Sequence, residues 1–499
     1  MWVHGVLFAV KVPENESEIQ GFGTVLGTNP YFLPKCTRKT QKIRVQNADL
    51  SPDIPGAQIE TRFTMKKLLI ALCITMTIGL CGCAGDEIVP TPTQAEVPST
   101  ILPTATPTPL PELTYPIQPD AEALSWIAGK MDAEQVILTT AQIEQENQRM
   151  LQQSSALTDI IKEKPASLSR AALNNLLYSC YFPDWARTDS QGQPISPQQV
   201  DRVMKNRGTA SVQDVNPVKM GIVTNRGSLK TLPTSMGAFQ SSQDLYDRLQ
   251  GTEVFVGMPV WVYHTSADGQ FYFIQTYFYQ GWVDVKCIAL TEDADLWQSF
   301  GDPSEFVTIL RPLRTIGEAK CDMGVRLPYV SRDESGFDVG LPVRETDGTL
   351  RVQNAKVSYQ DGYLGALPYT YQNFVTQAFL YKGTMYGYGG LNDGVDCSGF
   401  VAAVFRTFGL YLPRNTGGQQ GIVGKAVSVS GQGHQAIHNR LVATKYPTAV
   451  YLSGHVILYL GESESGSVFI HAPAVGEVVQ VTTKPNLAGA LYVNEVGPQ

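Results

Sequence analysis

The chain lacks an excess of basic residues, which limits the partners it can have. Its 499 residues include 38 Lys and Arg against 46 Asp and Glu, which gives a formal net charge of -8 at pH 7 and a pI near 5.4. Nucleic-acid-binding proteins instead carry a basic patch or stripe. The composition therefore argues against a nucleic-acid binder, and also against electrostatic adhesion to anionic polymers.

The sequence pattern also lacks a convincing metal site. His434 and His438 lie at a spacing that places both on one helix face, but no Cys, Glu or Asp stands in step nearby to complete a set of ligands. We interpret both as surface residues of a loop-like insertion, 431–438. No metal and no organic cofactor is predicted.

The apolar run after Met65 is too short to cross a bilayer. Lys66 and Lys67 precede about a dozen mostly apolar residues and then a region of small residues, whereas a spanning helix needs about 20. This pattern is typical of a secretory signal. Because such signals begin a chain, we predict a gene-model extension at 1–64 and a signal peptide at 65–83. The alternative is a core helix at 68–80.

The end of this run, Leu80-Cys-Gly-Cys83, resembles the lipobox of bacterial lipoproteins. The resemblance implies that Cys83 is lipidated and anchors an exported protein to a bacterial membrane, on the periplasmic or cell-envelope side. Residues 84–119 are rich in Pro and Thr, a composition that forms extended tethers rather than packed cores. A folded body held off a membrane is the predicted arrangement.

The length implies several domains, because single cores stop growing near about 250–300 residues. Residues 120–215 favour helices, with candidates at 121–129, 132–152 and 168–177, and Glu144, Glu146 and Arg149 are expected on a solvated face. Residues 216–295 and 296–366 each show short strands rich in β-branched and aromatic residues, separated by turns. We predict one small β-barrel in each of these two regions.

A glycine-rich loop, 387–396, runs into Cys397 and then into an apolar helix. Phe400, Val404 and Phe408 recur at helical spacing, so Cys397 is expected in the first turn. Helix N-terminal amides stabilise a thiolate and lower the pKa of a thiol. We therefore expect Cys397 to be a nucleophile; the alternative is a small buried apolar residue.

Two strand-like runs, 451–461 and 467–473, each carry one histidine. On adjacent antiparallel strands His455 and His471 could form a hydrogen bond. A thiol, an imidazole base and a group that orients the base form the arrangement of an activated nucleophile. Each histidine could otherwise be a satisfied core residue.

Several of these motifs occur together in one order: Tyr386-Gly-Tyr-Gly-Gly390, Asp396-Cys-Ser-Gly-Phe-Val401, Leu412-Pro-Arg414, Ser453-Gly-His-Val-Ile-Leu-Tyr-Leu-Gly461 and Ile470-His-Ala472. They resemble the NlpC-type bacterial cell-wall cysteine peptidases, which have a papain-like α+β fold and cut amide bonds in peptidoglycan stem peptides. The resemblance covers about residues 367–497, so we predict a peptidase domain at 367–499, and it implies Cys397 as nucleophile, His455 as base and His471 as the orienting group. Tyr388 replaces a common Trp, and the usual Gly-Asp-Leu segment before the His455 strand is missing.

The whole order resembles one subgroup with a helical N-terminal cap and two SH3-like barrels, so the predicted fold is multidomain α+β. Its members hydrolyse γ-D-glutamyl to diamino-acid bonds, and the resemblance implies that Asp396 and Ser398 hold the free amine of an N-terminal L-Ala. From the residues alone, Asp396 could equally be a helix N-cap, and Ser398 could be first-turn solvation. The aromatic stripe Phe271, Phe273, Tyr277 and Tyr279 is expected in a barrel core rather than on a ligand platform.

Two other functions remain open at this point. The chain could be a non-catalytic wall-binding lipoprotein, or an acyltransferase or amidase that uses the same Cys, His and His. A complete disulfide framework is not expected, because lipid on Cys83 and a free Cys397 leave Cys180, Cys287 and Cys321, an odd number. One bridge among these three is possible.

Overall fold

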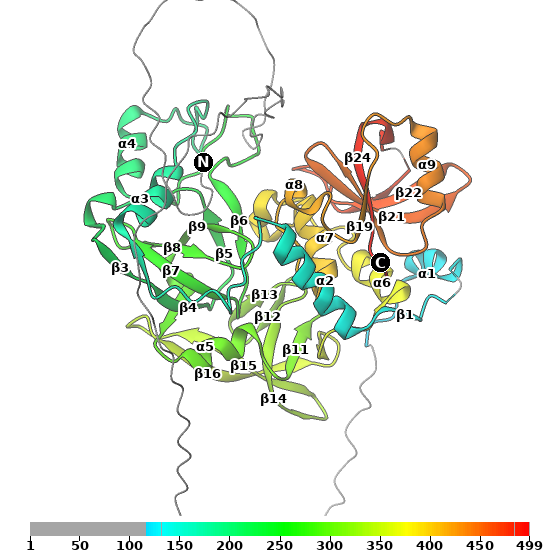
Figure 1. The fold of residues 1–499 in the computed structure, drawn as a ribbon, viewed down its shortest axis with the longest axis horizontal. Helices are drawn as coiled ribbons and strands as arrows, with labels where there is room; N and C mark the ends of the chain where they lie inside the picture. Colours follow the sequence, from blue (N-terminus) through cyan, green and yellow to red (C-terminus); the bar gives the residue numbers. More distant parts are fainter. Residues whose placement is uncertain (1–115, 131, 484, 499) are drawn as a thin grey trace, which may run out of the picture. The chain divides into compact units, whose positions relative to one another are not determined.

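The computed structural model describes residues 116–499, except residues 131, 484 and 499. The predicted extension, the signal peptide, Cys83 and nearly all of the linker 84–119 lie outside the described residues. The described part contains helices and antiparallel sheets in one chain (Figure 1), which confirms the α+β prediction. Within it, none of the helices combines the length and the apolar character that crossing a membrane requires.

Four helices lie in the segment predicted as a helical cap: α1 (Ala121–Ala128), α2 (Thr140–Gln153), α3 (Arg170–Ser179) and α4 (Pro197–Lys205). The predicted helix at 132–152 is wrong over its first part, because strand β1 (Val136–Leu138) precedes α2. Thr139 and Gln142 form a capping box that starts α2 at residue 140. A Thr followed three residues later by Gln is a start signal visible in the sequence.

Short strands also cross this segment. Strand β1 pairs with β18 (Tyr369–Thr370), and β2 (Ser167–Ser169) pairs with β3 (Val215–Pro217). The segment is therefore not purely helical, and β1 ties it directly to the C-terminal region.

Helix α2 is docked, which corrects the expectation of a solvated face. Glu146 is only 9% exposed; it pairs with Arg149 and accepts a hydrogen bond from the Gly424 amide at 2.9 Å. The Asn147 side chain donates to the Gly409 carbonyl at 2.8 Å. The polar face of α2 therefore satisfies backbone groups of the C-terminal region. Glu144 is exposed, as expected.

The first β region is a seven-stranded sheet in the order β10-β4-β7-β8-β9-β5-β6. Its strands are β4 (Lys219–Val223), β5 (Gly227–Lys230), β6 (Gln250–Val254), β7 (Pro259–Thr265), β8 (Phe271–Gln275), β9 (Gln280–Asp284) and β10 (Ile288–Thr291). Phe273 is 1% exposed and lies 5.1 Å from Trp282, ring centre to ring centre. Phe271, Tyr277 and Tyr279 also pack in hydrophobic clusters, which confirms the core interpretation of the stripe.

The second β region is a five-stranded sheet in the order β16-β15-β14-β11-β17, preceded by α5 (Ala294–Gly301). Its strands are β11 (Phe306–Ile309), β14 (Arg326–Asp333), β15 (Gly336–Arg344), β16 (Leu350–Ser358) and β17 (Gly362–Leu364). A separate hairpin joins β12 (Arg314–Ile316) to β13 (Ala319–Cys321).

The C-terminal region is a six-stranded antiparallel sheet in the order β19-β24-β20-β21-β22-β23, drawn in orange and red in Figure 1. Its strands are β19 (Lys425–Ser428), β20 (Thr448–Leu452), β21 (His455–Ser463), β22 (Gly466–His471), β23 (Gln480–Thr482) and β24 (Ala490–Glu495). Its helices are α6 (Tyr371–Phe379), α7 (Cys397–Arg406), α8 (Thr416–Gln419) and α9 (His434–Val442). Short 3₁₀ turns complete the described elements: η1 (Thr209–Ser211), η2 (Val285–Cys287), η3 (Tyr388–Asp393) and η4 (Leu487–Gly489).

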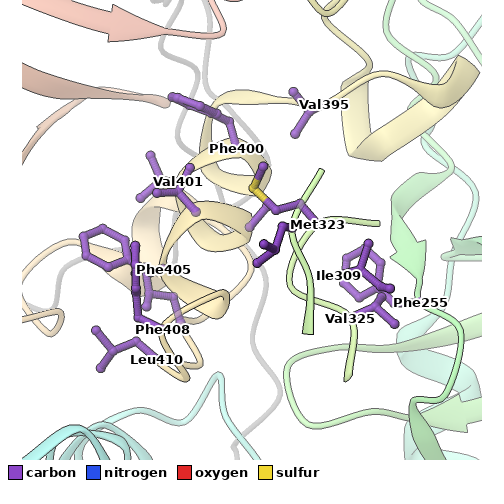
Figure 2. Close-up of a cluster of buried hydrophobic side chains, with 14 of the residues drawn as sticks. Phe255, Ile309, Met323, Val325, Val395, Phe400, Val401, Phe405, Phe408 and Leu410 are labelled. Carbon is purple, nitrogen blue, oxygen red and sulfur yellow. The ribbon is translucent and has the colours of Figure 1, made fainter. Parts of the chain in front are cut away.

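Helix α7 lies in a core shared with the second β region. Figure 2 shows Phe400 and Phe405 of α7 together with Met323 and Ile309, and Phe255 beside them. Each of these side chains is at most 7% exposed. The helix that starts at Cys397 is therefore held by residues from three regions of the chain.

Candidate active site

Cys397 is the first residue of α7, which confirms the predicted helix start. Asp396 is the N-cap, and its Oδ1 accepts a hydrogen bond from the Gly399 amide at 2.8 Å. The apolar positions Phe400 and Val404 are fully buried, so packing fixes the helix behind the thiol. The sequence periodicity placed this helix correctly because one face of it is core.

His455 begins β21 and His471 ends β22, and these two strands pair antiparallel. His455 Nε2 lies 2.9 Å from His471 Nδ1, so one imidazole donates a hydrogen bond to the other. The predicted proximity of the two histidines is therefore confirmed. With Nε2 engaged, Nδ1 of His455 remains as the nitrogen that could accept a proton from a neighbouring thiol.

The environment of Cys397 differs from the expectation of a thiol with a lowered pKa. Burial, followed by the negative charge of Asp396, raises the pKa of the Cys397 thiol to about 12. The backbone amides of Val456 and Ser398 act in the opposite direction, as does Arg414, but they do not overcome burial. The hydrogen bond from Val456 places the sulfur beside the residue that follows His455, and the thiol is neutral at rest.

Both histidines are also neutral near pH 7. Burial and the nearby His471 lower the pKa of His455 to about 4. Burial lowers the pKa of His471 as well, although the carboxylate of Glu477 partly offsets it. With both groups neutral, Cys397 and His455 do not form a thiolate–imidazolium ion pair at rest.

Asp396 and Ser398, the predicted amine-binding residues, belong to a buried ionic network. Arg414 binds Asp396 with two nearly parallel hydrogen bonds, Nη1 to Oδ1 at 2.9 Å and Nη2 to Oδ2 at 2.7 Å. Ser398 Oγ accepts from Arg414 at 3.1 Å and lies 3.3 Å from Asp396 Oδ1. The Gly389 amide adds a bond to Asp396 Oδ2 at 2.9 Å. These bonds keep the pKa of Asp396 low despite burial, which by itself raises it.

The first β region contributes two residues that sequence reasoning missed. Thr252 Oγ1 accepts a hydrogen bond from Arg414 Nε at 2.5 Å, and Glu253 Oε2 lies 3.6 Å from Arg414 Nη2. Burial raises the pKa of Glu253, against the influence of Arg414 and Arg226. Both residues lie in β6, far from Cys397 in the sequence, so no local motif could have identified them.

Gly390 leaves space for the Glu253 side chain, which contacts Arg414. Its φ is +81°, and a Cβ there would lie 1.9 Å from Glu253 Oε2. The same loop is held by Arg226, which donates to the Gly390 carbonyl at 2.9 Å and forms an ion pair with Asp322 at 3.0 Å. The glycine-rich loop is therefore shaped by both β regions.

Two tyrosines, Tyr386 and Tyr451, lie within electrostatic reach of Cys397. Burial, and then the charge that Cys397 would carry, raise the pKa of both Tyr386 and Tyr451. Tyr388, the replacement for the common Trp, packs edge to face on Tyr246 of the first β region, with ring centres 5.3 Å apart. The loop before Cys397 thus again contacts the first β region.

The remaining predicted features have plain structural roles. The segment around His434 and His438 forms helix α9 and not a loop, and His438 Nδ1 lies 3.0 Å from Ser467 Oγ. In the described part of the chain, no three His, Cys, Asp or Glu side chains are grouped as metal ligands. Cys180, Cys287, Cys321 and Cys397 are all free thiols, so none of the possible bridges among them forms.

Comparison with known families identifies two parts of the chain. Residues 383–489 match the NlpC/P60 family, and residues 239–284 match the SH3 domain of the SH3b1 type. The chain therefore contains an NlpC/P60 domain at its C-terminal end and an SH3b domain before it. Both matches confirm the resemblance inferred from the motifs.

Two curated relatives are named gamma-D-glutamyl-L-lysine dipeptidyl-peptidase. The protein from Bacillus subtilis (strain 168) is 26% identical over 191 residues, which are 37% of this chain and 56% of the relative. The protein from Bacillus cereus (strain ATCC 10987 / NRS 248) is 25% identical over 217 residues, 41% of this chain and 59% of the relative. The chain thus spans a little over half the length of each relative.

A solved structure of an NlpC/P60 endopeptidase from Photobacterium damselae subsp. piscicida has the same fold. It superposes with a TM-score of 0.62 at 20% identity and covers 79% of this chain and 99% of that chain. The likeness extends well beyond the NlpC/P60 domain, so the arrangement of elements upstream of residue 383 also has a counterpart.

Proposed function

We propose that the chain is a cysteine peptidase that hydrolyses the γ-D-glutamyl to diamino-acid amide bond of peptidoglycan stem peptides. The observation that carries the proposal is the position of Cys397 at the start of α7, against the strand that begins with the hydrogen-bonded His455. The names of the two Bacillus relatives support the choice of bond.

In this proposal His455 accepts the Cys397 proton at Nδ1 while the sulfur attacks the scissile carbonyl carbon. A tetrahedral oxyanion forms, and in this proposal the Cys397 backbone amide stabilises it, supported by the position of that amide at the helix start. The C–N bond then breaks as the His455 imidazolium, steadied by His471, protonates the leaving amine. Water hydrolyses the thioester, which releases the acid and restores the thiol.

We also propose that Asp396 and Ser398 help to recognise a free N-terminal L-Ala. Because Asp396 is already bound by Arg414, an ammonium would join an existing network rather than meet a bare carboxylate. Glu253 supplies a second carboxylate at the same place. Charge-assisted hydrogen bonds of this kind are roughly twice as strong as neutral ones.

The proposed location is the outer side of a bacterial membrane, with Cys83 as the lipid anchor. This part of the proposal rests on the sequence 80–83 and on the Pro-rich segment that follows. Metabolic labelling with a fatty-acid analogue, compared between the chain from Met65 and its Cys83→Ala variant, would test it. Labelling that persists in the variant would contradict it.

The activity is tested by mass spectrometry of products from L-Ala-γ-D-Glu-meso-diaminopimelate, with the amine free or acetylated. We expect residues 84–499 to release L-Ala-γ-D-Glu from the free peptide and Cys397→Ala to release none. Cleavage of both peptides would remove amine recognition from the proposal. Cleavage of neither would contradict the peptidase and favour wall binding or acyl transfer.

A further inference from the structure

A cavity lies apart from Cys397 and the two histidines. It has a volume of about 330 Å³ and is walled by α2, the segment 157–162, the β6 to β7 connection, the end of α5 and residues 324–326. At about 30 Å³ for each water-sized group, it holds on the order of ten non-hydrogen atoms. Neither the sequence motifs nor the family matches assign it a role.

Two arginines line this cavity without a carboxylate partner. Arg406, at the end of α7, is 6% exposed, and Arg326 begins β14. Among the described residues, neither guanidinium forms an ion pair, and the Nε of each is buried without a hydrogen-bond partner. Asp322, the carboxylate whose charge is felt at Arg406, is engaged by Arg226 at 3.0 Å.

The contacts that hold these arginines include no direct ion pair among the described residues, although Tyr277 bonds to Arg406. Arg406 lies over the Phe255 ring at 4.1 Å and donates to the Met323 carbonyl at 2.7 Å. Arg326 lies over Phe306 at 4.3 Å and over Tyr411 at 4.9 Å. Ring faces attract a cation weakly, whereas a buried charge normally requires an ion pair.

The position of Arg406 is fixed by a glycine. Gly324 has a φ of +79°, and a Cβ there would lie 2.9 Å from Arg406 Nε. The absence of a side chain at Gly324 therefore lets the Arg406 guanidinium pack against the main chain at the cavity wall. Leu151, Leu157 and Met258 make much of the remaining wall apolar.

Acidic residues in the outer part of the cavity limit the negative charge that a ligand can carry. Glu144, Asp159 and Asp302 contribute carboxylates, and Asp159 is paired with Lys162 at 3.1 Å. These carboxylates repel a ligand with several negative charges. A ligand with one negative group can still place that group against the two arginines. Guanidinium groups match carboxylate geometry well.

We propose that this cavity binds a small monocarboxylate with an apolar body, whose head meets Arg406 and Arg326 and whose tail lies against Leu151 and Met258. The site is independent of the proposed peptidase. A bound ligand would contact α2, α5 and the end of α7 at once, and so would stabilise the folded chain by mass action.

The test uses the chain 84–499 with octanoate as probe, by thermal unfolding and calorimetric titration. Octylammonium and 1-octanol supply the same tail without the anion, and acetate supplies the head without the tail. We expect octanoate alone to raise the unfolding temperature in proportion to its concentration, equally in the Cys397→Ala protein. That equality separates this cavity from the proposed active site.

Arg326→Gln should weaken octanoate binding by about tenfold or more, since hydrogen bonds to charged groups are the stronger ones. Leu151→Trp, which fills the cavity without touching its charges, should abolish binding, and Arg311→Gln, outside the cavity, should leave it unchanged. Equal effects of octanoate and 1-octanol, an unaltered affinity in both cavity variants, or no binding at millimolar octanoate would each overturn the proposal.

Discussion

Asp396 caps a helix and pairs with Arg414 at the same time, and the two roles can be separated. Asn is as good an N-cap as Asp, so Asp396→Asn keeps the cap and removes the charge opposite Arg414. Breaking a buried pair leaves an uncompensated charge, so we expect a loss of about 3–5 kcal/mol in the free energy of unfolding. Urea denaturation would measure it.

The matched control is Ser398→Ala, which removes one neutral hydroxyl from the same network and should cost about 0.5–1.5 kcal/mol. The double variant Asp396→Asn with Arg414→Met should recover part of the loss, because the orphan charge is gone. Additive losses in the double variant would show that the pair is not coupled.

The neutral histidines predict a pH dependence of stability. The pKa of His455 is about 4 in the folded chain against an ordinary value of 6.5, so the unfolded chain binds the extra proton first as pH falls. The free energy of unfolding is therefore unaffected by His455 titration above pH 6.5, and it falls progressively as the pH is lowered towards 4. Over this range His455 changes the free energy of unfolding by at most about 1.4 kcal/mol per pH unit.

Urea unfolding between pH 7.5 and 4.5 would test this dependence, with His455→Gln as the comparison because it cannot titrate there. We expect the wild-type chain to lose more stability than the variant over this range. Parallel curves would mean that the pKa of His455 is not lowered in the folded state.

At the scale of single residues, the sequence was enough to predict that Cys397 starts a helix and that His455 lies near His471, because each lies in a short motif with helix or strand character. The raised pKa of Cys397 could not be foreseen. The amides at the helix start lower the pKa of the thiol and can be expected from the sequence. Burial and the charge of Asp396 raise it, and the extent of burial depends on the tertiary structure. The motif 412–414 includes Arg414, but its pairing with Asp396 was not foreseen, and Thr252 and Glu253 were missed, because these contacts are tertiary.

At the scale of elements, α2 offers a direct test of docking. Its two glutamates differ in burial: Glu146 accepts from the Gly424 amide and pairs with Arg149, whereas Glu144 is exposed. Glu146→Ala leaves the buried Gly424 amide without its acceptor and removes the ion pair of Arg149, so we expect a loss of about 1–3 kcal/mol in the free energy of unfolding. Glu144→Ala should change it by no more than about 0.5 kcal/mol.

Equal effects of the two substitutions would mean that α2 is not held by this contact. Helix α7 was predicted well, because one face of it is buried in a regular period. The predicted strand-like run 451–461 was wrong as one strand, because a turn at 453–454 divides it into β20 and β21, which pair with each other. Elements were predicted poorly where the start depends on a cap, as at Thr139, or where a strand is only three residues long, as in β1. The pairing of β1 with β18 joins segments more than 200 residues apart, and no local pattern encodes it.

At the scale of the whole described chain, one hydrophobic cluster runs from Ile117 to Val496 and includes residues of both β regions and of α7. Such a shared core should make these regions unfold together. Phe255, labelled in Figure 2, lies where these regions meet and is 7% exposed. Its ring packs against Arg406 and Phe278. Phe255→Ala should therefore destabilise all of them by about 3–5 kcal/mol.

Hydrogen exchange with mass spectrometry can follow strands β7 to β9 and strands β20 to β22 separately during denaturation. We expect one midpoint for both sets in the wild-type chain, and the same downward shift of both in Phe255→Ala. If the SH3b strands shifted while the NlpC/P60 strands kept their midpoint, the shared core would not couple them. The contacts of Thr252 and Glu253 with Arg414 would then hold the site without stabilising the NlpC/P60 domain.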